Sequence, residues 1–147
     1  MKIYIGADHG GFELKEKLRA FVEGLGYEVQ DLGAHGLDEE DDYPDFVLPV
    51  GEQVSSEEGG MGIVIGRSGN GEAIAANKVG GVRAAVCASV EMARKAREHN
   101  NANVLSLGAD FVDQETAKEI VRAFLETPFS DEPRHVRRIE KITQFER

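Results

Sequence analysis

A glycine-rich segment that ends on an acid, Gly-Arg-Ser-Gly-Asn-Gly-Glu at residues 66–72, offers the clearest chemistry in the sequence. Glycines at 66, 69 and 71 let main-chain N–H groups turn toward a ligand, and a following helix would add its positive end. Glu72 would then stand beside these donors. A carboxylate placed there suits proton abstraction next to a carbonyl, because the base takes the proton while the donors stabilise the enediolate oxygen. By itself the pattern fits a tight turn with a dipole-compensating acid equally well, and it is neither a P-loop nor a dinucleotide fingerprint.

Two of the four histidines are expected near this loop. His9 follows Asp8 after the first hydrophobic run, and His99 precedes Asn100 at the end of a helix-length segment. In an open α/β sheet, ligands bind beyond the carboxyl ends of the strands, and we place all four residues at that edge. Histidine titrates near neutrality, which suits proton transfer or contact with an anion, although either histidine alone could simply bond to main chain.

Cys87 and the acidic run at 38–42 receive structural interpretations. Cys87 ends a hydrophobic run with no histidine nearby in sequence, which favours a small buried side chain. The acidic run lacks the glycine spacing of a calcium loop and is interpreted as a solvated loop. No cluster of His, Cys and carboxylates has metal-ligand spacing, so we expect neither a metal nor a cofactor.

The elements that must position these residues follow from the hydrophobic pattern. Short β-branched runs alternate with amphipathic segments of helix length, which is typical of a parallel sheet covered on both faces. Five strands are expected, at Lys2–Gly6, Tyr27–Leu32, Gly62–Ile65, Val82–Cys87 and Asn103–Leu107. Right-handed crossovers then predict one domain over residues 1–147, a Rossmann-like three-layer α/β/α sandwich with a five-stranded parallel sheet.

Residues 134–147 are predicted to form a terminal amphipathic helix. One face carries cations and another carries apolar side chains: Arg134, Arg137, Arg138 and Lys141 against Val136, Ile139, Ile142 and Phe145. This helix could pack on its own domain. The alternative is that it packs on a partner subunit and brings its cations to the neighbour's pocket.

The net charge of −10, from 27 acids and 17 bases, argues against a nucleic-acid partner. No apolar run approaches the roughly 20 residues of a membrane span. The N-terminal run meets Asp8 too soon to supply the core of a signal peptide, and the single cysteine fits a reducing compartment. A cytoplasmic protein is therefore expected.

Several long motifs, taken together, resemble the family of ribose-5-phosphate isomerase B and galactose-6-phosphate isomerase. They are GADHGGFELK at 6–15, DYPDF at 42–46, GNGEAIAANK at 69–78, VRAA at 82–85, AREHNNAN at 96–103 and RHVRRI at 134–139. The resemblance implies a metal-independent enzyme of the pentose phosphate pathway that interconverts ribose 5-phosphate and ribulose 5-phosphate through a cis-enediolate. It also implies a homodimer, or a tetramer built from dimers, whose active sites are shared between subunits.

Carried over by position, the resemblance assigns catalytic roles. Glu72 would be the general base, since the subgroup that uses a cysteine base has it where this chain has Gly66. Ser68 would move protons between the substrate oxygens, and the N–H groups of Gly69, Asn70 and Gly71 would form the anion hole. His99, with Asp8 nearby, would open the sugar ring.

The resemblance also assigns substrate contacts. Asn100 would hold a sugar hydroxyl and Tyr43 would line the sugar site. His9, together with Arg134 and Arg138 of the partner subunit, would bind the phosphate, and His135 would reach the sugar.

Two positions depart from the family pattern. Arg67 stands where the family has glycine before the loop serine, and Gly108-Ala109-Asp110 stands where it usually has Gly-Gly-Arg. Arg67 is expected to replace part of the missing cation or to pair with Asp110; the alternative is a solvent-exposed Arg67 and weaker phosphate binding. Isomerisation of a six-carbon phosphosugar or of an unphosphorylated sugar therefore stays open, as does a non-catalytic phospholigand-binding module.

Overall fold

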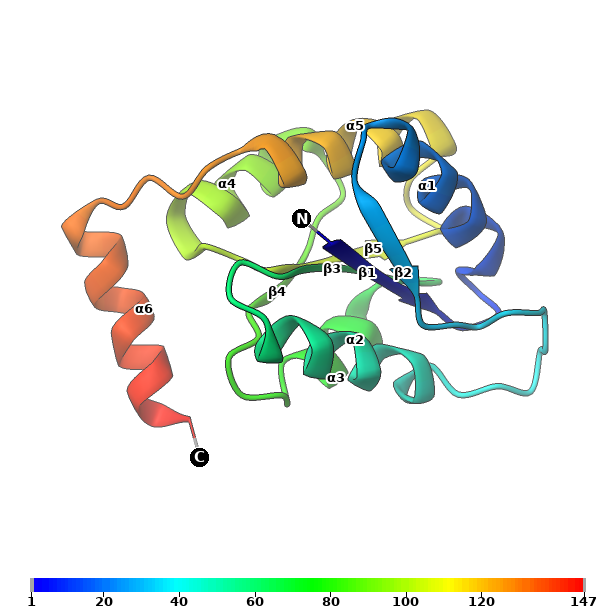
Figure 1. The fold of residues 1–147 in the computed structure, drawn as a ribbon, viewed down its shortest axis with the longest axis horizontal. Coiled ribbons are helices and arrows are strands. Elements are labelled where there is room, and N and C mark those ends of the chain that lie inside the picture. The colour runs from blue at the N-terminus through cyan, green and yellow to red at the C-terminus, as the bar shows by residue number, and fades with distance from the viewer. Residues whose placement is uncertain (1, 147) are drawn as a thin grey trace.

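Five parallel strands form one sheet in the order β2-β1-β3-β5-β4, and helices cover both of its faces (Figure 1). The computed structural model describes residues 2–146. The strands are β1 (Lys2–Ala7), β2 (Glu28–Asp31), β3 (Met61–Gly66), β4 (Ala84–Val86) and β5 (Val104–Gly108). All five predicted strands are confirmed. β4 is half as long as expected, because it pairs on one side only, with β5, and lies at the edge of the sheet.

Six helices complete the fold: α1 (Phe12–Gly24), α2 (Pro44–Ser56), α3 (Asn70–Ala76), α4 (Val90–Asn100), α5 (Gln114–Glu126) and α6 (Pro133–Phe145). Local sequence signals fix several of their ends. Ser89 and Asp113 accept hydrogen bonds from the N–H groups of Met92 (3.2 Å) and Thr116 (2.7 Å), as N-cap residues do. Pro44 opens α2, where a missing N–H costs nothing.

The core lies in two layers, one on each face of the sheet. Helices α1, α4 and α5 bury Leu18, Ala93 and Phe124 against one face, while α2 and α3 bury Val50 and Ala76 against the other. The predicted three-layer α/β/α sandwich is therefore confirmed. Cys87 is 2% exposed, as predicted, and burial raises the pKa of its thiol to about 11.

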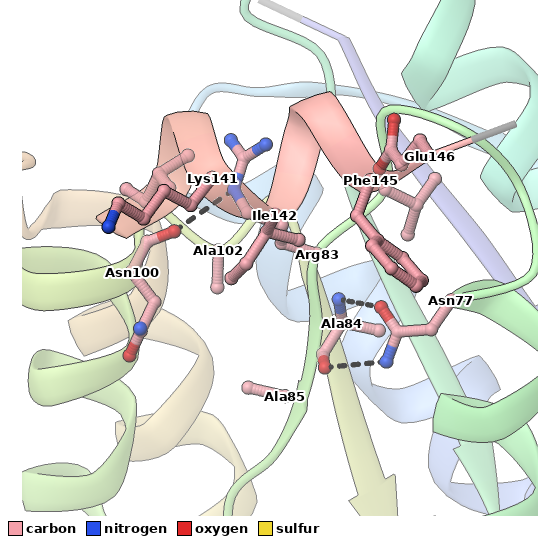
Figure 2. Close-up of a pocket in the computed structure, with 12 residues that line it drawn as sticks. Asn77, Arg83, Ala84, Ala85, Asn100, Ala102, Lys141, Ile142, Phe145 and Glu146 are labelled. Carbon is pink, nitrogen blue, oxygen red and sulfur yellow. Dashed lines mark hydrogen bonds between the residues drawn. The ribbon is translucent and has the colours of Figure 1, made fainter. Parts of the chain in front are cut away.

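Helix α6 stands away from the two helical layers, at the end of the molecule where β4 forms the sheet edge (Figure 1). Its apolar stripe is largely uncovered: Ile142 is 53% exposed and Phe145 is 80% exposed. A groove of about 720 Å³ separates this stripe from β4. Figure 2 shows Phe145 and Ile142 facing β4 across the groove, beside Asn77, whose amide exchanges two hydrogen bonds with the main chain of Ala84.

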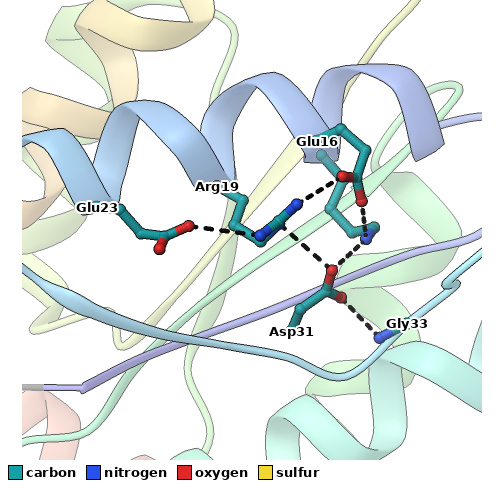
Figure 3. A network of polar contacts seen from close by, with 6 residues as sticks. Glu16, Arg19, Glu23, Asp31 and Gly33 are labelled. Carbon is teal, nitrogen blue, oxygen red and sulfur yellow. Dashed lines mark hydrogen bonds and ion pairs between the residues drawn. The ribbon is translucent and has the colours of Figure 1, made fainter.

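A buried lysine, Lys15, ties α1 to the end of β2. Figure 3 shows Glu16 and Arg19 of α1 beside Asp31 in this network. The Nζ of Lys15 is fully buried and donates to Asp31 (2.6 Å) and Glu16 (2.8 Å). Asp31 also accepts from the N–H of Gly33 (2.9 Å), and Gly33 in turn accepts from the N–H of Ala7 (2.8 Å). This chain of bonds fixes the chain segment next to Asp8, so the fold positions the first candidate site residue through Lys15.

Candidate active site

The carboxylate of Glu72 lies at the carboxyl end of β3, in the first turn of α3. Glu72 is 4% exposed. Its carboxyl group fills the space that a side chain at position 66 would need, since a Cβ built on Gly66 would overlap Oε1 of Glu72. Burial, and secondarily the nearby charge of Asp8, raises the pKa of Glu72 above its usual value. A desolvated carboxylate of this kind is suited to act as a base near neutral pH.

The loop before α3 is held by a left-handed glycine. Gly69 has φ +83° and its carbonyl accepts from the buried hydroxyl of Ser106 (2.7 Å). Ser68 accepts from the N–H of Asn70 (3.2 Å). Within residues 2–146, the N–H groups of Gly69 and Gly71 meet no acceptor. The loop therefore presents main-chain donors close to the Glu72 carboxylate.

Tyr43 covers this loop. A Cβ on Gly71 would lie 2.6 Å from Cζ and 2.8 Å from the hydroxyl of Tyr43, so only glycine allows the tyrosine ring to approach so closely. Tyr43 is the N-cap residue of α2, directly before Pro44. The structure thus places the Tyr43 ring against Gly71, the residue directly before Glu72.

Asp8 and His9 follow β1 at the same edge. Asp8 is buried and accepts from the N–H of Gly10 (3.0 Å). His9 pairs with Asp41, an acid that the sequence analysis assigned to a solvated loop: Nδ1 of His9 is 2.7 Å from Oδ1 of Asp41. That assignment is wrong for Asp41, whose side chain is only 9% exposed.

Asp8, His9 and Asp41 are also the residues that could hold a cation. Their ligand atoms lie within 4.8 Å of one another, and no other such group occurs in the described part of the chain. The Nδ1 atom of His9 is 4.0 Å from Oδ2 of Asp8. His9 and Asp41 are already hydrogen-bonded to each other, so we interpret the three residues as a hydrogen-bonded network.

Arg67 pairs with Asp110, as one of the two sequence hypotheses stated. The nitrogen–oxygen distance is 3.9 Å, and both side chains are more than half exposed. The stem of Arg67 crosses Gly10, where a Cβ would lie 2.6 Å from its Cγ. Arg67 and His9 then line a cavity of about 470 Å³ together with Lys17. The two departures from the family pattern therefore contact each other beside the candidate anion pocket.

His99 and Asn100 lie at the amino ends of the strands, which contradicts their expected place at the carboxyl ends. A helix between parallel strands runs back to their amino ends. Asn100 ends α4 there, next to Asn101, whose carbonyl accepts from Arg83 just before β4 (2.9 Å). With a rise of roughly 3.3 Å per strand residue, the length of the sheet separates His99 from Asp8 in one chain.

The candidate residues of α6 accompany His99 rather than Glu72. The rings of His135 and His99 are stacked, with centroids 4.4 Å apart. His135 is 6% exposed, and burial, with the nearby His99 and Arg134, lowers its pKa. Arg134 pairs with Glu132 (2.9 Å), and Arg138 is exposed. One chain therefore carries two separate groups of candidate residues, one at the carboxyl ends of the strands and one at their amino ends.

The comparisons with known proteins agree with this architecture. The family model described as Ribose/Galactose Isomerase matches residues 3–142. Ribose-5-phosphate isomerase B of Mycolicibacterium paratuberculosis is 46% identical over 147 residues, which cover 100% of this chain and 92% of the relative.

Solved structures are equally similar. Ribose-5-phosphate isomerase B of Clostridium thermocellum has a TM-score of 0.94 and 50% identity, over 99% of this chain and 97% of that one. The enzyme of Mycoplasma genitalium, described with bound ribulose-5-phosphate, has a TM-score of 0.95 and 41% identity, over 99% and 95% of the two chains.

The fold and the buried carboxylate beside main-chain donors are those of a Rossmann-like protein equipped for proton transfer. The chain belongs to the ribose/galactose isomerase family, because the family model matches nearly its whole length. Among residues 2–146, no helix has the length and apolar character needed to cross a membrane.

Proposed function

We propose that this protein interconverts ribose 5-phosphate and ribulose 5-phosphate with Glu72 as the general base. The observation that carries the proposal is the buried Glu72 carboxylate, which directly follows the loop whose Gly69 and Gly71 N–H groups meet no acceptor among residues 2–146 and whose Gly71 lies against Tyr43. The relative that binds ribulose-5-phosphate in its solved structure supports the choice of sugar.

The reaction needs two proton movements. Glu72 takes the proton from C2 of the open-chain aldose and returns it to C1, while the N–H groups of Gly69 and Gly71 stabilise the oxyanion of the cis-enediolate. The hydroxyl of Ser68 passes a proton from O2 to O1. Atoms and charge balance over the cycle, so the proposed reaction requires no cofactor.

The remaining residues act from a second copy of the chain in this proposal. His99 and Asn100 would open the ring and hold a hydroxyl, and Arg134 and Arg138 would bind the phosphate opposite His9. One chain holds Glu72 and His9 at the carboxyl ends of its strands and His99 at their amino ends. Only a partner subunit can therefore bring the two groups together. The exposed apolar stripe of α6 and the groove beside β4 offer the partner a surface. The proposal therefore includes a homodimer in which the C-terminal helix at 134–147 of each chain packs on the partner subunit. It also includes a cytoplasmic location, because the single cysteine, Cys87, fits a reducing compartment.

A second candidate substrate, another sugar, is favoured by one observation. Asp110 occupies the position where the family usually has a phosphate-binding arginine, and it draws Arg67 into an ion pair at 3.9 Å. A weaker phosphate site would relax the requirement for a phosphorylated pentose. Assays on five- and six-carbon sugars, each with and without phosphate, separate the two candidates by kcat/KM.

Replacing the base tests the proposed reaction directly. Glu72→Gln keeps the shape of the side chain and removes its basicity, so kcat should fall roughly 100- to 10,000-fold. Solvent deuterium incorporation into the product should disappear with it. Glu58→Gln, at an exposed position, is the matched control and should retain full activity. Near-normal turnover by Glu72→Gln would refute the assignment.

A further inference from the structure

Asp41 makes two hydrogen bonds to one residue. Its Oδ1 accepts from the main-chain N–H of His9 (3.1 Å) and lies 2.7 Å from Nδ1 of the same residue. Its other oxygen, Oδ2, is buried and has no hydrogen-bond partner among residues 2–146. The carboxylate is thus desolvated and directed at His9, so its charge acts on the imidazole with little screening by water.

These contacts define both the orientation and the protonation of the ring. Since Asp41 accepts at Nδ1, that nitrogen carries a proton in either charge state, and Nε2 is left as the group free to meet a ligand. His9 lines the cavity that also contains Arg67 and Lys17. A protonated Nε2 would add a third donor to those two cations.

We propose that Asp41 is a positioning residue of the phosphate site: it holds His9 so that Nε2–H, as part of an imidazolium, donates to the substrate phosphate. This inference rests on the proposed function, because it presumes a phosphorylated substrate at His9. It adds a residue outside the carried-over motif roles, one that bonds to His9 and does not line the cavity.

The other charges around His9 do not reproduce the effect of Asp41. The hydrogen bond that His9 donates to Asp41 is the largest cause that raises the pKa of His9 above its ordinary 6.5, with Asp8 next among the raising charges. Partial burial and Arg67 act in the opposite direction. The charged groups that line the cavity around His9 are Glu13 and Lys17 of α1, Glu39 of the acidic run, Arg67, and Asp113 before α5.

Histidine titration by NMR tests the first half of the inference, without substrate. In Asp41→Asn the pKa of His9 should fall below its wild-type value, whereas Glu40→Gln, an adjacent exposed acid with the same change of charge, should leave it in place. The resonances of His35, His99 and His135 report whether the fold is intact. An unchanged titration of His9 in Asp41→Asn would overturn the inference, whatever reaction the protein catalyses.

Kinetics as a function of pH test the second half. Between pH 6.5 and 9 the phosphate ester stays largely dianionic, because its second pKa is near 6. KM for ribose 5-phosphate should rise about 3- to 10-fold in Asp41→Asn at a pH between the His9 pKa values measured for the two proteins, and the ratio of variant to wild-type KM should shrink toward pH 6.5 as His9 of the variant gains its proton. The value of kcat should change little, since Asp41 does not touch the reacting carbons.

Two outcomes contradict the phosphate role specifically. One is a pH-independent loss of kcat, which would show that Asp41 only holds its loop. The other is a shifted His9 titration with an unchanged KM profile. If the chain shows no activity on ribose 5-phosphate, the proposed function fails on its own, and inorganic phosphate replaces the sugar as probe: wild-type His9 should shift on phosphate addition at pH 8, and the Asp41→Asn response should be weaker. An equal response in the two proteins would overturn the inference.

Discussion

The carboxylate of Glu72 occupies the space of a side chain at Gly66, so the two positions share one catalytic volume. Any Cβ at residue 66 must expel the carboxylate of residue 72, and the expelled group would leave the pocket beside Asp8. A base can therefore be supplied from either position but not from both. This geometric exclusion explains why a glycine ends β3 in a chain whose base is on α3.

Gly66→Ala should consequently inactivate the protein without touching a reactive group. We expect kcat to fall at least about 100-fold, as for loss of a positioned base, while the melting temperature drops only modestly. Gly24→Ala is the control, because a Cβ at Gly24 meets nothing within 4 Å. Activity comparable to that of the wild type in Gly66→Ala would mean that Glu72 is not held where the reaction needs it.

The acid limb of the pH–activity profile should report Glu72. Its pKa is raised above 4.5 by burial and by the charge of Asp8, and the base is active only when deprotonated. Activity should therefore fall as pH decreases through a midpoint above 4.5. In Asp8→Asn the midpoint, measured from residual kcat/KM, should move to lower pH, while Asp110→Asn should leave it unchanged. A midpoint that ignores Asp8 would contradict the coupling.

Arg67 and Asp110 should oppose each other in substrate binding. If Arg67 contributes to the phosphate site, Arg67→Ala raises KM with little change in kcat, and Asp110→Asn lowers KM by releasing the guanidinium. Both side chains are largely exposed, so their pair should contribute only about 0–1 kcal/mol to stability. Unchanged kinetic constants in both variants would show that Arg67 points to solvent without binding phosphate.

The buried Lys15 should matter for stability without taking part in the chemistry. Asp31→Asn leaves the ammonium of Lys15 buried with Glu16 alone and should cost about 3 kcal/mol in urea unfolding. Lys95→Met, which breaks the exposed pair with Glu98, should cost less than about 1 kcal/mol.

The same network should make stability depend on acid pH. Hydrogen bonds from Lys15 and Arg19 hold the pKa of Glu16 at about 2, below its usual 4.5. A depressed carboxyl pKa stabilises the fold above pH 4.5, and this contribution disappears as pH falls toward 2. Lys15→Met should flatten that dependence, and an unaltered pH profile of the unfolding free energy would refute the link.

The sequence predicted the sheet and the Glu72 loop because both depend on local signals. Hydrophobic runs mark the strands, and Ser89 and Asp113 mark helix starts through bonds that span three residues. The predicted place of His99 is wrong because α4 runs back along the sheet, so its last turn lies at the amino ends of the strands. Asp41 was missed because its burial depends on a contact with His9 across 32 residues, which composition cannot show.

The proposed sharing of active sites can be tested by mixing two inactive variants. Glu72→Gln removes the base at the carboxyl ends of the strands, and His99→Asn removes the ring-opening group at their amino ends. In a dimer of one chain of each kind, one site takes Glu72 and His99 from the two intact positions, and the second site lacks both. Random reassociation makes half of the dimers mixed, so the mixture should recover about a quarter of wild-type activity, the share expected for two equivalent sites of a symmetric dimer.

Glu72→Gln mixed with Ser68→Ala is the matched control. Both of those residues lie in the loop 66–72 of one chain, so every site keeps one defect and no activity should return. Recovery in the control, or none in the test pair after confirmed subunit exchange, would rule out a site built from two chains.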